Sequence, residues 1–87
     1  MTLAELRTQL AQYTDLPGDT IVVLAKDAEG NSFSPLADIS PAMYLAESTY
    51  SGEHYMTEEQ RQAMDDPDEY GEAPDGSVRA VFLWPTN

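Results

Sequence analysis

The chain opens with an apolar and polar pattern that predicts an amphipathic helix over residues 2–13. Its apolar residues recur at the spacing of one helical face: Leu3, Leu6, Leu10 and Tyr13. Thr2 stands at the expected N-cap, and Glu5, three residues later, completes the sequence of a capping box. The turn-forming residues of "TDLPGD" then end the helix.

Two later apolar runs predict strands that pair with each other. Residues 20–26 ("TIVVLAK") hold four consecutive apolar residues, three of them β-branched, which indicates a buried strand. In residues 78–84 ("VRAVFLW") both alternating sets are largely apolar, so we expect a central strand that is covered on both faces over part of its length. We expect this closing strand to pair with residues 20–26.

Turn-forming residues divide the middle of the chain into short pieces. The pattern predicts a turn at 27–31 ("DAEGN"), a short return strand at 32–36 ("SFSPL"), a strand at 42–49 ("AMYLAEST") and a bend at 50–55 ("YSGEHY"). Pro35 ends the return strand or confines it to a sheet edge, because proline cannot donate to a strand ladder. The bend is expected around Gly52. The run at 42–49 is too short to show which of its faces is buried.

A second helix signal lies in "MTEEQRQAMDD". Thr57 stands at the cap, Gln60 is its capping-box partner, and Glu58 and Glu59 occupy the first turn, where the helix dipole favours negative charge. Pro67 stops this helix after about two turns. A polar loop, "DPDEYGEAPDG", then leads to the closing strand.

These elements predict one α+β domain over residues 1–87. Its N-terminal helix packs on a small, mostly antiparallel sheet of three or four strands. The second short helix and the acidic loop form a segment, residues 53–76, that is inserted before the C-terminal strand. The core is expected to be modest, since a chain of 87 residues buries only about 60–65% of its unfolded surface.

Charge is the strongest signal in the composition. The chain carries 16 acids against four bases, a net charge of −12. Residues 53–76 alone hold nine acids and only Arg61, a net charge of −8. Because phosphate backbones and anionic membranes both require basic residues, we expect neither direct nucleic-acid binding nor membrane binding. A macromolecular partner would instead present a basic surface.

The remaining composition narrows the candidate chemistry. The chain has no cysteine and a single histidine, which removes disulfides and the common zinc sites, and we expect no cofactor. The N-terminus lacks the basic and then apolar layout of a signal peptide. No apolar run approaches the roughly 20 residues that span a bilayer. We therefore expect a cytoplasmic protein.

Three segments resemble a group of small acidic proteins of bacteriophages and prophages: "LAELRTQLAQYTDLPGDTIVVLAKDAEGNSFSPLADI", "YLAESTYSGEHY" and "AVFLWPTN". A leading helix, an "LP.DT.VVL..D.EGN..SPL" segment and a terminal "LWP.N" recur in that group. The resemblance covers most of the chain and implies a phage or prophage origin. It implies no assigned activity, so no functional residue is carried over. It favours an accessory role in host takeover, such as blocking a defence system by binding.

Calcium binding is one alternative for the acidic loop, because carboxylates alternate in "DPDEYGE". Counting Asp66 as the first residue of a calcium loop places Tyr70 at the fifth ligand position and Ser77 at the twelfth, where a bidentate glutamate is required. In residues 27–31 ("DAEGN") the glycine comes too early. We therefore favour an ordinary acidic loop over a metal site.

Hydrolytic chemistry is a second alternative. His54 is the only histidine, and either Ser48 or Ser51 would have to approach it to form a nucleophile and base. Nothing in their spacing supports that arrangement, and the chain has no glycine-rich phosphate loop. We expect a protein that is not an enzyme.

A solvated face that aids solubility is the ordinary interpretation of such a run of acids. A recognition surface is the alternative that we pursue, because the net charge of −12 exceeds what solubility requires. A rigid array of carboxylates imitates DNA phosphates, and tyrosine is favoured at interfaces. The predicted partner-binding residues are Glu58, Glu59, Asp65, Asp66, Asp68, Glu69, Glu72, Tyr44, Tyr50 and Tyr55. We expect a phage-type inhibitor of a host protein with a basic surface, such as an anti-CRISPR protein or another nucleic-acid mimic. The alternative is a small structural or metal-binding accessory domain without an inhibitory role.

Overall fold

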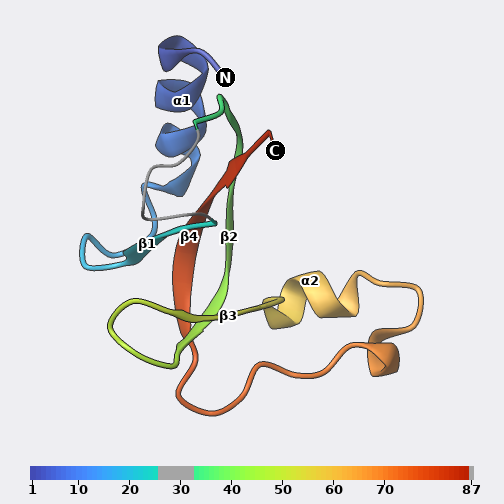
Figure 1. Cartoon of the computed structure of the whole chain (residues 1–87). Helices are drawn as coiled ribbons and strands as arrows, with labels where there is room; N and C mark the ends of the chain where they lie inside the picture. Colours follow the sequence, from blue (N-terminus) through green and yellow to red (C-terminus); the bar gives the residue numbers. More distant parts are fainter. Residues whose placement is uncertain (26–32, 87) are drawn as a thin grey trace. The chain divides into compact units, whose positions relative to one another are not determined.

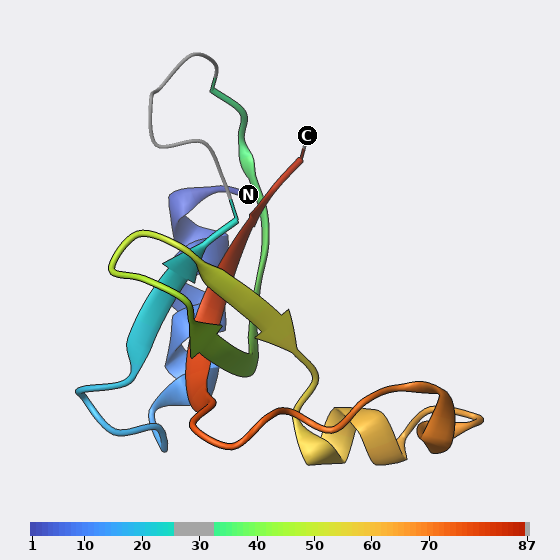
Figure 2. The ribbon, with the colours of Figure 1, turned by 60° about the horizontal axis from the view of Figure 1, so that its bottom comes forward.

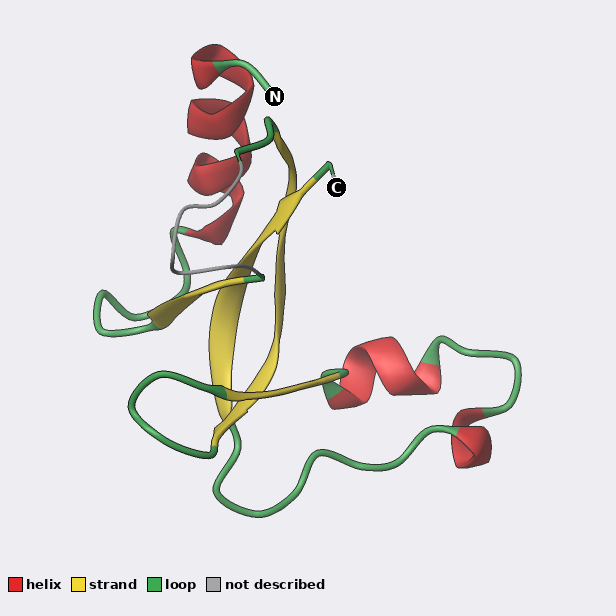
Figure 3. Ribbon diagram, viewed as in Figure 1, coloured by secondary structure: helices red, strands yellow, loops and turns green. Residues whose placement is uncertain are grey.

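The computed structural model describes residues 1–25 and 33–86. Figure 1 and Figure 3 show the helices and strands of these residues. In chain order the elements are α1 (Leu3–Leu10), η1 (Ala11–Tyr13), β1 (Ile21–Leu24), β2 (Leu36–Ala46), β3 (Gly52–Tyr55), α2 (Glu58–Gln62), η2 (Pro67–Glu69) and β4 (Val78–Pro85). The turn predicted at 27–31 lies outside the described residues.

The four strands form one sheet in the order β1-β4-β2-β3. β2 and β3 are antiparallel, with Tyr44 opposite His54, whereas β1 runs in the same direction as β4 (Figure 2). The sheet is therefore mixed, and the α+β class is confirmed. The closing strand is central, as predicted, and it pairs with β1, since the Ala25 amide donates to the Leu83 carbonyl at 3.1 Å.

Contacts within the chain divide it into two compact units. The first, called here the terminal unit, comprises Met1–Ser40 and Val81–Asn87. The second, the acidic unit, comprises Pro41–Ala80 and contains the whole acidic segment, residues 53–76. Each unit is described by itself.

A capping box at Thr2 begins α1 in the terminal unit. The Thr2 hydroxyl accepts a hydrogen bond from the Glu5 amide at 3.1 Å, and the Glu5 carboxylate accepts one from the Thr2 amide at 3.2 Å, so the predicted capping box is confirmed. The N-terminal ammonium group donates to the Leu36 carbonyl at 2.8 Å, which ties the start of α1 to β2. Leu6 and Tyr13 on the predicted apolar face are half-buried.

The core of the terminal unit lies on β2 and β4. Ile39, Val81 and Phe82 are buried, and the rings of Phe82 and Trp84 stack with their centroids 5.8 Å apart. The half-buried indole of Trp84 donates to the Ser40 hydroxyl at 2.9 Å, so its polar atom is satisfied. Neighbouring residues of β4 are buried in succession, which confirms that this strand is covered on both faces over part of its length.

The predicted burial of the first strand is wrong. β1 spans only Ile21–Leu24, and Ile21, Val22 and Leu24 are exposed. The apolar run identified a strand correctly, but β1 is at the sheet edge and has a neighbour on one side only. An apolar run does not reveal how many neighbours a strand has.

The division of the middle region is also wrong. Phe33–Pro35 are not in a strand, and one long strand, β2, replaces the pieces expected at 32–36 and 42–49. Pro41 lies inside β2, just before Met43, where pairing with β3 begins. Its carbonyl accepts a hydrogen bond from the Gln60 side chain at 2.9 Å, which ties this part of β2 to α2.

A β-hairpin replaces the bend expected at residues 50–55. The Glu47 amide donates to the Ser51 carbonyl at 2.9 Å and closes the turn between β2 and β3. Gly52 then begins β3, where a Cβ atom would collide with the ring of Tyr44 and would stand 2.6 Å from the Leu45 carbonyl oxygen. The glycine is thus needed for the close approach of the Tyr44 ring, and not for a bend.

We predict that Gly52→Ala destabilises the protein by about 1–3 kcal/mol, because the added methyl group displaces the Tyr44 ring or the β2 backbone. The free energy of unfolding in urea measures the effect. Gly71→Ala is the matched control, since a Cβ at Gly71 meets nothing within 4 Å. Equal stability of the two variants would contradict the packing described for the hairpin.

Candidate functional site

The cap of α2 anchors the acidic unit. Thr57 is only 4% exposed, its hydroxyl accepts from the Gln60 amide at 3.1 Å, and the Gln60 side-chain oxygen accepts from the Thr57 amide at 2.8 Å. This confirms the predicted capping box. The amide nitrogen of the same Gln60 side chain donates to the Pro41 carbonyl. One glutamine therefore both closes the cap and holds α2 against β2.

Arg61 organises the acidic segment. Its side chain is only 11% exposed, and its Nε donates to the Tyr70 carbonyl at 2.8 Å. The guanidinium forms an ion pair with Glu58 at 2.9 Å and lies 3.8 Å from both Asp68 and Glu72. The only basic residue of the segment thus ties residues 68–72 to α2. The loop is attached to the helix by contacts from several directions.

Other acids of the segment have no such partner. Within residues 1–25 and 33–86, five exposed carboxylates of the segment form no hydrogen bond or ion pair through their side chains: Glu53, Asp65, Asp66, Glu69 and Asp75. Asp65 and Asp66 precede η2 and Glu69 is its last residue, so all three are close in sequence to the residues that Arg61 holds. Their charge is left open to a partner.

All ten predicted site residues fall in the acidic unit. The seven acids come from α2 and from residues 65–72, and all seven are exposed. Tyr50, in the turn between β2 and β3, is 90% exposed. Tyr44 and Tyr55 are half-buried on the hairpin, so part of each ring serves packing. Tyr50 is therefore the most accessible of the three predicted aromatic contacts.

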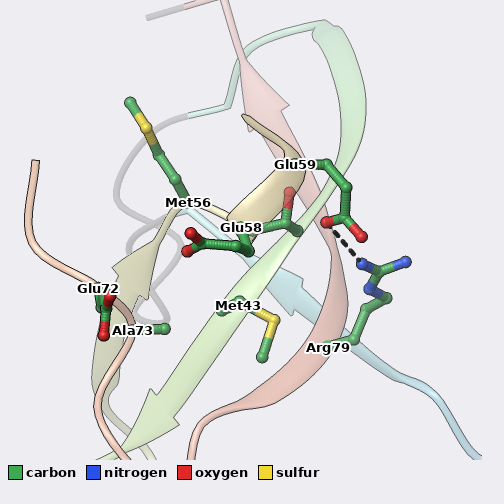
Figure 4. A pocket seen from close by; sticks show the side chains of 8 residues that line it. Met43, Met56, Glu58, Glu59, Glu72, Ala73 and Arg79 are labelled. Carbon is green, nitrogen blue, oxygen red and sulfur yellow. Dashed lines mark hydrogen bonds and ion pairs between the residues drawn. The ribbon is translucent and has the colours of Figure 1, made fainter. Parts of the chain in front are cut away.

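A cavity of about 400 Å³ opens beside the first turn of α2 (Figure 4). Its lining combines carboxylates with apolar side chains: Met43, Met56, Thr57, Glu58, Glu59, Glu72, Ala73 and Arg79. Arg79 of β4 forms an ion pair with Glu59 at 3.3 Å. Sequence reasoning missed Arg79 and both methionines, because only the fold brings β2 and β4 to α2. In the sequence analysis, Arg61 entered only the net charge of residues 53–76 and was given no structural role.

The carboxylate of Glu59 is held in its charged form. A hydrogen bond from its own backbone amide is the largest cause that lowers its pKa, followed by the Thr57 hydroxyl and the positive charge of Arg79. The negative charge of the exposed Glu59 is therefore stabilised by groups at the first turn of α2 and by Arg79. It remains anionic at neutral pH.

In the part of the chain that the structure describes, side chains named for the metal and hydrolytic alternatives make other contacts. In the described residues, no group of three or more histidine or acidic side chains is placed to hold a metal ion. Asp68 and Glu72 face Arg61 instead, and the candidate loop at 27–31 lies outside the described residues. The hydroxyls of Ser48 and Ser51 are 3.0 Å apart and bond each other in the hairpin turn.

Comparisons with known proteins add no constraint. No protein-family model, curated protein or solved structure matches the chain. Among the described residues, no helix has the length and apolar character required to cross a membrane.

We predict that Arg61→Ala releases residues 66–72 from α2, because the guanidinium supplies every ion pair that joins them. Hydrogen exchange of the Glu69 and Tyr70 amides should become at least about tenfold faster, while exchange in β4 changes little. Arg7→Ala, on α1, removes the same charge from the other unit and serves as the control. Unchanged exchange in 66–72 would contradict the role given to Arg61.

We predict that Glu59 stabilises the fold in a pH-dependent manner. A carboxyl whose folded-state pKa is lowered stabilises the protein above its unfolded pKa, and that contribution is lost as the pH falls through the folded pKa. The deficit of Glu59→Gln in unfolding free energy should therefore be full at neutral pH, above the ordinary glutamate pKa of about 4.3, and should shrink as the pH falls below that value. A deficit of Glu59→Gln that stays constant between neutral and acidic pH would contradict this prediction.

Proposed function

We propose that this protein is a non-enzymatic, phage-type accessory protein that binds a host protein through the exposed face of its acidic unit and thereby inhibits it. The partner presents a basic surface, such as the nucleic-acid-binding channel of a defence nuclease. The concrete form of this proposal is an anti-CRISPR or similar DNA-mimic inhibitor that acts in the host cytoplasm. No cofactor takes part.

The observation that carries the proposal is the attachment of the acidic loop by Arg61. A mobile acidic chain loses conformational entropy when it binds, whereas a loop already attached to a helix loses less. Arg61 is nearly covered by the residues it contacts, and Asp65, Asp66 and Glu69 nearby remain unneutralised. The acidic unit therefore offers a partly ordered array of anions, which is what imitation of a DNA backbone requires.

Charge density supports the same partner chemistry. The net charge of −8 in 24 residues creates a local negative field that steers basic partners and repels nucleic acids. Tyr50, 90% exposed beside this segment in the same unit, supplies an aromatic contact of the kind favoured at interfaces. The resemblance to small phage proteins favours inhibition as the consequence of binding.

We predict that the triple charge reversal of Asp65, Asp66 and Glu69 to lysine abolishes partner binding and leaves the fold intact. These side chains are exposed and make no contact, so circular dichroism and the melting temperature should change little. Asp68 is left unchanged because it faces Arg61. The matched control reverses Asp15, Asp19 and Asp38, three exposed acids of the terminal unit, and both triple variants change the net charge from −12 to −6.

Affinity capture from bacterial lysate, followed by kinetic measurement on the purified partner, provides the readout. Binding to wild type and to the control variant should have an on-rate that falls as salt rises, while the variant at Asp65, Asp66 and Glu69 binds at least about 100-fold more weakly. Duplex DNA should displace the protein from a nucleic-acid-binding partner. Undiminished binding by the variant, with its fold intact, would show that the acidic surface only aids solubility.

A further inference from the structure

The two edges of the sheet differ in chemistry. β3, at one edge, carries Glu53, and a charged residue protects an edge from pairing with other chains. β1, at the other edge, reads Ile-Val-Val-Leu and has no charge, proline or glycine. Val22 is 65% exposed and Leu24 is 60% exposed. An exposed aliphatic edge strand is a template for adding another strand.

The hydrogen bonds of β1 show which backbone groups are open. The Ala25 amide donates to Leu83 on β4, and the amide and carbonyl of one strand residue point to the same side. Alternation therefore directs the backbone of Ile21 and Val23 toward β4 and that of Val22 and Leu24 outward. In residues 1–25 and 33–86, no other strand pairs with this outer side.

We propose that the outer edge of β1 binds the β1 strand of a second copy of this chain, which gives a symmetric antiparallel dimer with a continuous sheet. A two-fold axis beside Val23 places Val22 of one copy opposite Leu24 of the other. Each of these two pairs exchanges two backbone hydrogen bonds, so all four open amides of the two strands are satisfied.

One alternative register is disfavoured by the residue that precedes β1. Placing Val22 opposite its own copy would bring Leu24 opposite Thr20 and require an outward Thr20 amide. That amide already donates to the Pro17 carbonyl at 3.0 Å. The register centred on Val23 uses only groups that the described residues leave open.

The distribution of charge favours contact between two copies of the chain at β1 and disfavours such contact at the acidic unit. Residues 1–25 contain three acids and Arg7, whereas residues 53–76 carry a net charge of −8. Two copies that meet at β1 therefore bring together a weakly charged part of the chain. A strongly basic partner gains little at a strand without carboxylates, and an aliphatic strand is matched by an identical one. This site is separate from the proposed partner-binding surface.

Sedimentation equilibrium at protein concentrations from about 10 μM to 1 mM tests the proposal, because an interface restricted to a strand edge is small and corresponds to weak association. Wild type should show a mass that rises toward twice the monomer. Val22→Lys combined with Leu24→Lys should remain monomeric, since lysine is an effective guard of sheet edges. Val78→Lys is the matched control, because Val78 is also exposed but lies on the central strand, and it should dimerise like wild type.

A cysteine variant tests the register independently of the lysine variants. The chain has no cysteine, so Val23→Cys introduces a single thiol that should lie beside its own copy at the two-fold axis. Under oxidised glutathione, Val23→Cys should form a covalent dimer at least about tenfold faster than Val78→Cys. Two results would each overturn the proposal: a wild-type protein that stays monomeric at 1 mM, or equal cross-linking at both positions.

The dependence on salt concentration distinguishes dimerisation at β1 from the binding of a basic partner in the proposed function. Added salt screens the repulsion between two chains of net charge −12, so dimerisation at β1 should strengthen or stay constant, whereas binding to a basic partner should weaken. The triple variant at Asp65, Asp66 and Glu69 should still dimerise. Loss of dimerisation in that variant, with its fold intact, would contradict the assignment of the dimer contact to β1.

Discussion

The guanidinium of Arg61 is the contact on which the acidic unit depends. It bonds the Tyr70 carbonyl, pairs with Glu58 and faces two further carboxylates, and it is the only base among nine acids in residues 53–76. Isolated surface ion pairs contribute little, typically about 1 kcal/mol or less. Arg61 differs because one nearly buried cation is shared by groups on both α2 and the loop, and because its bond to a carbonyl is directional. Without it, like charges would drive the loop away from the helix.

The same contact explains why a strongly acidic segment can present an ordered surface. Arg61 forms ion pairs with Glu58, Asp68 and Glu72, and Arg79 forms one with Glu59. These neutralised carboxylates hold the loop and β4 to α2. The carboxylates without partners stand beside them. The structural role and the proposed partner-binding role are thereby divided among residues of one chemical type. Composition alone cannot make that division, since all of these acids look alike in the sequence.

Apart from the pairing of the closing strand with β1, what the sequence predicted correctly is local, and what it missed is long-range. Both capping boxes depend on residues three positions apart, and the closing strand is an apolar run, so each was readable from a short window. The role of Arg61 depends on a carbonyl nine residues away, and the contact that holds α2 against β2 joins Gln60 to a carbonyl 19 residues away. The β2–β3 hairpin was missed because Gly52 indicates a bend in isolation. Its need for a glycine comes from the Tyr44 ring on the facing strand.

The apolar and charged surfaces of this chain obey opposite physical rules. The open edge of β1 lies in the terminal unit, where charges are few, and the unneutralised acids lie in the acidic unit. Backbone pairing of aliphatic strands is insensitive to salt or favoured by it, whereas capture of a basic surface depends on an unscreened field. Because the two contacts use different residues in different units, each can be removed without altering the other. A dimer that also bound a basic partner would present two acidic units at once, and binding through both would raise its avidity without any new contact.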